Sequence, residues 1–337
     1  MRQTAEAVSI GHPDKIADYI SSTILDRLIE QDPMVRYAVE VMIKGNTVIL
    51  GGEVSGHVNM IALDNYVKQA LRQIGYDERY AQIWEDKAID IHKVQVLNLI
   101  GLQSTEIGQG VSQNGWGDQG IFVGYACQGE GFINRELFLT RKLNKALYNL
   151  ARQSDNLGLD IKTQITLADD GHIETAIAAI PMKESVNLDD FICQVLEEKP
   201  DQLIVNGTGI YQTHASIADC GITGRKLACD FYAGACPIGG GSPWTKDATK
   251  ADLTLNLYAR KLAASNLSDN DECFIYLSSC IGRAELPSAT IKTIKNGVIQ
   301  TANLTIYEKP DKIIEMLGLR KPVYANLCRD GFTAVSL

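Results

Sequence analysis

Cationic and acidic side chains gather beside glycines in one stretch of the chain, between residues 219 and 252. Its first part reads DCGITGRK and holds Arg225 and Lys226, and its second part reads GGGSPWTKDATKAD and holds Lys246 and Lys250. Three consecutive glycines let backbone N–H groups approach a ligand closely. Four cations beside such donors are suited to a polyphosphate. A solvated helix end would explain the lysines alone, but it leaves the glycines without a purpose.

Three further pieces of sequence carry groups of the same kind. The motif GHPDK at 11–15 puts a histidine, a carboxylate and a lysine at an expected helix start, where they could serve a metal–phosphate group. Taken alone, this motif is better explained as a capped helix with solvated charges. Asp160 and Lys162 begin a strand, and alternation puts both on one side. Glu40 and Glu53 lie on the two strands of one hairpin, where a surface location is the default.

One glycine motif invites a different reading. Residues 115–120, GWGDQG, match the dinucleotide-binding pattern GxGxxG letter for letter. That pattern needs a strand before it and a helix after it. Here a polar loop precedes the motif and a strand-like run over 121–125 follows. A dinucleotide-binding domain is therefore rejected, and the absence of GxxxxGK[ST] from the sequence excludes a P-loop nucleotidase.

The elements that must position these residues alternate without long linkers. Apolar spacing predicts an amphipathic helix over 13–31. Period-two alternation then predicts hairpins, each followed by a helix. This order occurs three times, with strands over 35–43 and 47–54, 163–168 and 173–180, and 289–294 and 298–306, and helices near 59–74, 188–197 and 311–317. Three such units predict three related α+β domains.

Another helix is expected through Leu253 to Leu262. Thr245 or Asp247 could cap its N-terminus. In that case Lys246 and Lys250, four residues apart, would lie on one face at an exposed helix start.

Composition describes a globular protein that could bury a substantial core. The chain has 337 residues, of which 45% are hydrophobic and 22% charged, and its formal net charge is −9. Such a chain is neither disordered nor a coiled coil, and the length suggests two to three domains. The negative charge makes nucleic acid an unsuitable partner. Without an apolar signal core or an 18-residue apolar run, we expect a cytoplasmic protein with no membrane contact. Eight scattered cysteines without a CxxC pair are expected to be reduced thiols.

Taken together and in order, the motifs resemble those of the S-adenosylmethionine synthetase (methionine adenosyltransferase) family. The resemblance covers nearly the whole chain, and the set of motifs is far more specific than any one of them. It runs through GHPDKIAD (11–18), AVEV…GGEV (38–54), IGLQSTEIGQGV (100–111), GWGDQG (115–120), DIKTQIT (160–166), NGTG (206–209), DCGITGRK (219–226), GGGSPWTKD (239–247), IGRAE (281–285) and MLGLRKPVY (316–324).

The resemblance implies an ATP:L-methionine S-adenosyltransferase. Methionine sulfur attacks C5′ of the ATP ribose and expels triphosphate, which the same site cleaves to phosphate and diphosphate. A thioether has no proton to lose, so this step needs alignment and stabilisation of an anionic leaving group rather than a general base. The fold implied is α+β, with three similar α/β-sandwich domains around a pseudo-threefold. The domains would span 1–104, 112–217 and 219–330, with segments exchanged between them.

The resemblance also implies the parts that individual residues play. Catalysis would fall to His12, Lys162, Arg225, Lys226 and Lys246. ATP and its polyphosphate would be bound by His12, Asp160, Lys162, Tyr211, Asp219, Arg225, Lys226, Ser242 and Lys246. Methionine would be bound by Glu53, Gln103, Asp118, Asp219 and Lys250. Asp14 and Asp252 would hold Mg²⁺, Glu40 would hold K⁺, and the loop after Gln103 would be a lid.

Self-association is implied as well, as a homodimer or a dimer of dimers. Two subunits would pack sheet against sheet and share their active sites at the interface.

The chain also departs from the family pattern. Ile210 stands where the family has arginine, and His214-Ala215-Ser216 replaces a GGP stretch. Ser242-Pro243-Trp244 follows the three glycines in place of small residues, the lid segment between Val111 and Gly115 is short, and 328–332 replaces an aromatic–glycine signature. Two alternatives to an active synthetase therefore stay open. One is a catalytically weak paralogue that binds ATP or triphosphate and regulates a full-length synthetase, and the other is an ATP or polyphosphate hydrolase.

Overall fold

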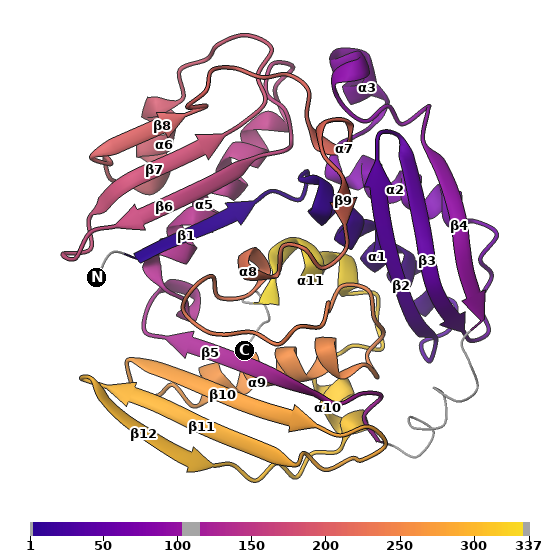
Figure 1. Ribbon diagram of the computed structural model, residues 1–337, viewed down its shortest axis with the longest axis vertical. Helices are drawn as coiled ribbons and strands as arrows, with labels where there is room; N and C mark the ends of the chain where they lie inside the picture. The colour runs from indigo at the N-terminus through magenta and orange to yellow at the C-terminus, as the bar shows by residue number, and fades with distance from the viewer. Residues whose placement is uncertain (1–2, 103–114, 333–337) are drawn as a thin grey trace.

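Three sheets of four strands each surround the centre of the molecule in the computed structural model, which describes residues 3–102 and 115–332 (Figure 1). Their strand orders are β4-β3-β2-β9, β1-β6-β7-β8 and β12-β11-β10-β5. Helices cover one face of each sheet, and short helices and loops fill the space where the three sheets meet (Figure 1). The expected fold class, three similar α/β units, is confirmed.

The first sheet is built on the hairpin of β2 and β3. The strand β4 runs parallel to β3, and the two-residue strand β9 pairs with Met42 and Ile43 at the end of β2. Two long helices, α1 and α2, pack against this unit. The bounds of its elements are β2 Arg36–Lys44, β3 Thr47–Ser55, β4 Gln95–Leu102, β9 Gly221–Ile222, α1 Pro13–Ile29, α2 Leu63–Ile74, α3 Glu78–Trp84 and the 3-10 turn η1 Glu85–Lys87.

The other two sheets repeat the hairpin-plus-helix pattern. The second has the elements β1 Gln3–Val8, β6 Lys162–Leu167, β7 Ile173–Ala179, β8 Gln202–Val205, α5 Arg135–Ala151 and α6 Asp189–Leu196. The third has β5 Gly120–Cys127, β10 Glu272–Ser279, β11 Ser288–Lys295, β12 Val298–Asn303, α9 Ala251–Ser265 and α10 Pro310–Met316. The remaining short elements are η2 Glu130–Phe132, α7 Ala215–Ala218, α8 Leu227–Asp230 and α11 Tyr324–Asp330. The expected helix near 59–74 thus begins at Leu63, and the strand expected to reach Ile306 ends at Asn303.

Each sheet takes one strand from a distant part of the chain. The N-terminal strand β1 pairs with β6, so that Val8 lies opposite Lys162. The strand β5 pairs with β10, and β9 pairs with β2. These exchanges bring the chain back to the molecular centre between sheets, and the segments 9–14 and 223–226 lie at those crossings (Figure 1).

The central helix α1 is buried almost all round, although its sequence predicts an amphipathic helix. Every residue of α1 except Arg27 is buried. It packs on β2 and β9 of the first sheet and on the helices α2 and α11. Most of its polar groups find partners inside the protein, although the Thr23 hydroxyl has none among the described residues. The Ser21 hydroxyl donates to Val39 O at 2.8 Å, and the Asp26 carboxylate accepts the N–H groups of Tyr324 and Ala325 at 2.9 Å. A helix surrounded by other elements has no solvent face.

Several general expectations can now be compared with the structure. All eight cysteines are free thiols, as expected. The dinucleotide reading of 115–120 stays rejected, because the strand β5 follows it rather than a helix. None of the described helices combines the length and apolar character needed to cross a membrane.

Candidate active site

His12 stands at the start of α1, with its side chain buried at 2% exposure. Pro13 occupies the first helical position, and the His12 ring caps the helix by accepting the Asp14 N–H at Nδ1, 3.2 Å away. The ring proton therefore sits on Nε2. Burial, followed by the charges of Lys226 and Lys162, lowers the pKa of His12 to about 3. The imidazole is thus neutral at physiological pH and offers Nε2–H as a hydrogen-bond donor.

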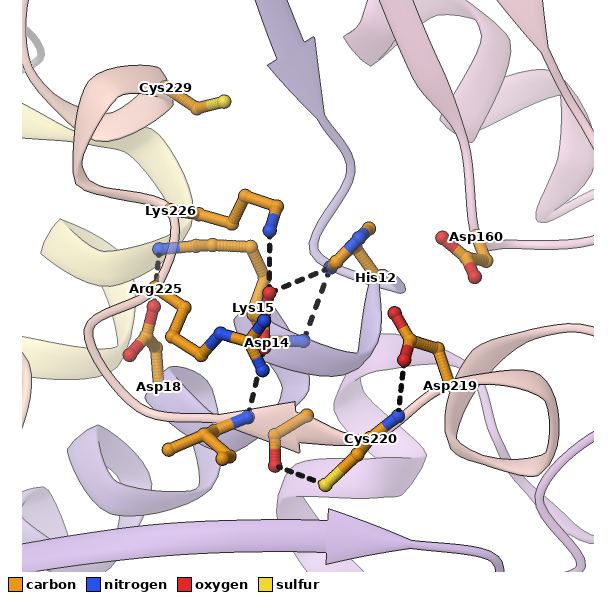
Figure 2. Close-up of polar contacts among 12 residues, drawn as sticks. His12, Asp14, Lys15, Asp18, Asp160, Asp219, Cys220, Arg225, Lys226 and Cys229 are labelled. Atoms are coloured by element: carbon orange, nitrogen blue, oxygen red, sulfur yellow. Dashed lines mark hydrogen bonds and ion pairs between the residues drawn. The ribbon is translucent and has the colours of Figure 1, made fainter.

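Asp14 is the buried carboxylate at the centre of this group. One oxygen accepts the Lys226 ammonium at 2.6 Å, and the other accepts the Ile222 N–H at 2.9 Å (Figure 2). Burial alone would raise the pKa of Asp14, but the hydrogen bonds from Lys226 and Ile222 outweigh it and lower the pKa. Arg225, which is 55% exposed, approaches the same carboxylate at 4.0 Å. The prediction that the charges of GHPDK are solvated is wrong, because tertiary contacts bury Asp14 and Lys15.

Glu40 on β2 is held by two threonine hydroxyls. Thr223 donates to one carboxylate oxygen, and Thr245 donates to the other at 3.1 Å. Glu40 is exposed, as expected for a surface residue, but its carboxylate is part of a cluster of oxygen atoms. Such oxygens are the donors that hard cations select.

The segment after the three glycines lies along β2. Asp247 N–H donates to Tyr37 O at 3.0 Å, and Val39 N–H donates to Thr245 O at 2.9 Å. This pairing places the Lys246 ammonium in contact with the Asp252 carboxylate. A Cβ on Gly241 would lie 2.1 Å from Asp252 Cγ, which explains a glycine at that position.

The prediction that Thr245 or Asp247 caps the N-terminus of α9 is wrong. Lys250 is the N-cap residue and makes no side-chain cap hydrogen bond. Thr245 binds Glu40 instead, and Asp247 accepts the Thr249 and Tyr37 N–H groups. Lys246 therefore belongs to the extended segment and Lys250 to the helix start, so the two lysines do not share one helical face.

Asp160 and Asp219 face the space beside His12 (Figure 2). One Asp160 oxygen accepts the Ala215 N–H at 3.0 Å, and the other is buried without a hydrogen-bond partner. Burial raises the pKa of Asp160 to about 6, and the neighbouring charge of Lys162 opposes that rise. Asp219 is exposed and accepts the Cys220 N–H at 2.7 Å.

The pKa of Asp160 leads to a prediction about stability and pH. A carboxyl group whose pKa is raised by folding stabilises the fold below the unfolded value near 4, and this stability is lost as pH rises through about 6. The free energy of unfolding of Asp160→Asn, compared with that of the parent, should therefore be about 2 kcal/mol higher at pH 7.5 than at pH 4. Urea unfolding at both pH values measures the difference. Asp155→Asn, which alters a side chain that is 63% exposed, is the control. A constant difference between parent and Asp160→Asn at both pH values would contradict this assignment.

The remaining predicted residues lie at varying distances from this group. Ser242 packs against Gly224, and its buried hydroxyl has no hydrogen-bond partner. Tyr211 is half-buried near Asp160, and burial raises its pKa. Glu53 lies on the same face of the first sheet as Glu40, beside the Ala38 that pairs with Lys246. Asp118 is exposed before β5, where it accepts the Gln119 N–H.

Among the predicted residues, the structure brings together His12, Asp14, Asp160, Lys162, Asp219, Arg225 and Lys226. Glu40 and Ser242 adjoin this group through Thr223 and Gly224, and Lys246 and Asp252 pair with each other. The structure shows no contact that joins Asp118 or the Lys250 side chain to this group within the described residues. Gln103 and the lid that was expected to follow it lie outside the described residues.

Sequence reasoning missed a buried network behind the site. The Lys15 ammonium binds Asp230 at 2.8 Å and Asp18 at 3.2 Å, and Trp244 Nε1–H donates to Asp230 at 2.8 Å. The other Asp18 oxygen accepts the Gly224 N–H at 2.8 Å. Burial raises the pKa of Asp18 to about 7, and the charge of Asp230 adds to this rise while that of Lys15 opposes it. Lys15 stands in the GHPDK motif, but no sequence signal links it to Asp230.

The residues expected to bind metal ions fit hard cations. Asp14 and Asp252 each present a carboxylate beside a lysine. Within the described residues, no three His, Cys, Asp or Glu side chains lie close enough together to hold a metal ion by themselves. A Mg²⁺ ion there would need its other ligands from phosphates and water, which is how Mg²⁺ is commonly held. The Glu40 carboxylate and the hydroxyls of Thr223 and Thr245 present oxygen atoms, which suit K⁺.

The amino-acid sequence matches the models of one known protein family over most of the chain. The model of the S-adenosylmethionine synthetase N-terminal domain matches residues 1–105, and the model of the C-terminal domain matches 214–336. The structure is similar to that of an unusual S-adenosylmethionine synthetase from Campylobacter jejuni, with a TM-score of 0.85 and 31% identity over 98% of this chain and 94% of that chain. This chain belongs to the S-adenosylmethionine synthetase family.

Proposed function

We propose that the chain is an ATP:L-methionine S-adenosyltransferase. The observation that carries the proposal is the placement of Lys226 and Asp14 beside the neutral, buried His12. In this arrangement a carboxylate and a cation can hold a metal–polyphosphate group while a neutral imidazole keeps one N–H donor. Family membership adds the reaction that such a group would serve.

The proposed step needs no general base. An electron pair of methionine sulfur forms the bond to C5′ of ATP, while the C5′–O bond breaks and its electron pair stays on triphosphate. His12 Nε2–H would donate to the leaving oxygen, and Lys162, Arg225, Lys226 and Lys246 would balance the triphosphate charge. Mg²⁺ held by Asp14 and Asp252 would neutralise further phosphate charge when bound. Glu53, Gln103, Asp118, Asp219 and Lys250 would bind methionine, and Tyr211, Asp160 and Ser242 would contact ATP.

The function is tested by incubating the purified chain with ATP, Mg²⁺, K⁺ and methionine. Mass spectrometry should detect S-adenosylmethionine, with phosphate and diphosphate, only when ATP and methionine are both present. Breakdown of ATP that does not depend on methionine would instead indicate a hydrolase. Binding of ATP or triphosphate without product would indicate the regulatory paralogue.

Glu40 supplies a prediction about K⁺. Glu40→Gln removes the charge but keeps an oxygen beside Thr223 and Thr245, so it should raise the K⁺ concentration for half activation about tenfold, which is about 1.4 kcal/mol. The Mg²⁺ response should stay the same. Asp14→Asn is the matched variant and should chiefly weaken the Mg²⁺ response. Identical effects of the two variants in Mg²⁺ and K⁺ titrations would refute separate ion sites.

Ile210 supports the second candidate, a catalytically weak paralogue. Its side chain is 49% exposed and lines a cavity of about 320 Å³ with Asn206 and Asp189. The exposed position leaves room for a longer side chain. Ile210→Arg should raise kcat/KM about tenfold if the guanidinium recovers about 1.4 kcal/mol of transition-state stabilisation. Steady-state kinetics measure the change, and a fall in kcat/KM at unchanged thermal stability would reject the lost-cation account.

We further propose that two copies pair through the outer face of the first sheet, as a homodimer or within a dimer of dimers. Met42, Leu97 and Leu99 on that face are 39%, 48% and 61% exposed. Burial of these side chains against a second copy would remove apolar surface from water. Sedimentation velocity of the parent and of Leu99→Arg tests the interface, and an unchanged sedimentation coefficient in the variant would refute it.

A further inference from the structure

A second, larger cavity lies behind the start of α1. Its volume is about 880 Å³, and its walls come from the end of β1, the first turn of α1, one face of α5, and the ends of α8 and α11. Small-molecule sites in proteins commonly enclose about 300–1,000 Å³. Of the described residues, neither His12, Asp14, Lys226 nor Lys246 lines it. The cavity is therefore separate from the candidate active site.

The lining of this cavity is strongly basic in a chain that is acidic overall. Five cations line it, namely Lys15, Arg141, Lys145, Arg152 and Arg329. Only two carboxylates accompany them, those of Asp230 and Asp330. The excess of positive charge inside a concave surface attracts anions.

Three of the five cations already have fixed partners. Lys15 binds Asp18 and Asp230, Arg141 donates to the carbonyls of Cys229, Asp230 and Phe231, and Arg329 pairs with Asp330 at 2.9 Å. The contacts of Lys15 are buried, whereas Arg329 and Asp330 stay 48% and 36% exposed.

The other two cations have no acidic partner in the described part of the chain. Lys145 is exposed to the cavity, and Arg152 hydrogen-bonds the hydroxyl of Tyr148, a neutral partner. Lys145, Tyr148 and Arg152 follow one another at intervals of three and four residues, so they share the face of α5 and its C-terminal cap that lines the cavity. Two uncompensated charges thus face one hollow beside amide groups of Asn149 and Gln153.

We propose that this cavity binds a small polyanion, a molecule that carries at least two phosphate or carboxylate groups. Lys145 and Arg152 supply the charge, Arg329 adds to it, and the amide groups supply hydrogen bonds. Charge-assisted hydrogen bonds to lysine and arginine are the strong ones by which proteins hold such groups.

The cavity is joined to the candidate active site by the network of Lys15. Asp230 lines the cavity and binds Lys15, which binds Asp18, which accepts the N–H of Gly224 directly before Arg225 and Lys226. An anion that draws on Lys15 or displaces Asp230 changes the support of that turn. The ligand is thus placed to act as an effector of polyphosphate binding, a consequence that rests on the proposed function.

Binding itself is tested without turnover. Isothermal titration is carried out with pyrophosphate and, in a parallel arm, with citrate, on chains that carry Lys246→Ala to weaken anion binding at the candidate active site. Adding Lys145→Ala and Arg152→Ala should weaken binding of at least one probe tenfold or more. Lys142→Ala is the matched control, because this lysine lies on the same helix and pairs with Glu197 at the surface. It should change the affinity less than twofold.

The two probes separate the possible sources of the anion. Binding of pyrophosphate alone identifies a phosphorylated ligand, and binding of citrate alone identifies a polycarboxylate. Lys145 and Arg152 are exposed, so the variant should fold, and its circular dichroism and melting temperature verify this. Absence of binding by both probes, or equal affinities in the cavity variant and the Lys142→Ala control, would overturn the proposal whether or not the chain proves to be a synthetase.

Discussion

Lys226→Ala is expected to lower kcat about a hundredfold or more. The Lys226 ammonium lies 2.6 Å from the Asp14 carboxylate and near enough to His12 to lower its pKa. Its removal takes away one preorganised cation at the proposed leaving group, and the loss of one such donor typically costs about 3 kcal/mol in the transition state. The fold should persist, because Arg141 holds the carbonyls of the following helix α8. Quantification of S-adenosylmethionine under saturating substrates measures the effect.

Lys142→Ala is the matched control for this experiment. This lysine pairs with Glu197 at the surface, and its replacement should leave kcat within twofold. Triphosphate affinity gives a second readout that does not depend on product formation. A Lys226→Ala variant with parental kcat and parental triphosphate affinity would show that the polyphosphate does not bind at Asp14 and Lys226.

Lys15→Met should destabilise the protein by about 3–5 kcal/mol, the usual cost of removing one partner from a buried ion pair. The side chains of Lys15, Asp18 and Asp230 are 5%, 0% and 6% exposed, so the two carboxylates would be left without a cation in a buried place. Burial alone would lower the pKa of Lys15, but Asp230 and Asp18 outweigh it and raise the pKa. The lysine is therefore charged throughout the physiological range. Urea unfolding at pH 7.5 measures the loss.

A double variant separates the lost charge balance from lost packing. Lys15→Met with Asp230→Asn removes one of the two stranded charges and should recover at least about 1 kcal/mol, since contacting residues in one network do not act additively. Lys93→Met is the control, because Lys93 is 67% exposed in its ion pair with Asp90 and should cost less than about 1 kcal/mol. A loss no larger than that of the control would mean that the network is not a stabilising ion cluster.

The hairpin units were predictable because their signals are local. Alternation over residues 35–43 and 47–54 and the Gly45-Asn46 turn determine β2 and β3 with little help from the rest of the chain. The same holds for β6 with β7 and for β11 with β12. The ends of elements were less predictable, because α9 begins where the β2-bound segment of Thr245 and Asp247 finishes, and that segment is set by tertiary pairing.

The grouping of Asp14 with Lys226 was reached through the family resemblance rather than through local pattern. Their contact joins residues separated by 212 positions, and neither hydropathy nor spacing carries such information. For the same reason, the ion pair of Lys15 with Asp230 could not be predicted, and the local pattern of GHPDK wrongly indicated solvated charges. Burial of α1 on all sides could not be read from its sequence, because that sequence retains polar residues whose partners lie elsewhere in the chain, in β2, α11 and residues 222–244.

The exchange of strands bears on how the protein is made. The edge of β2 is covered by β9 and by residues 245–247, so the first sheet stays open until more than two thirds of the chain has been synthesised. In the nascent chain that edge presents unpaired backbone groups, which invite pairing with other chains. The pairing of β1 with β6 must likewise close a loop of about 150 residues, and the entropy lost in closing it is offset only once the strands are in contact. The first unit therefore cannot be completed before the second has been synthesised, and the residues of the candidate active site assemble only after Asp252 has been made.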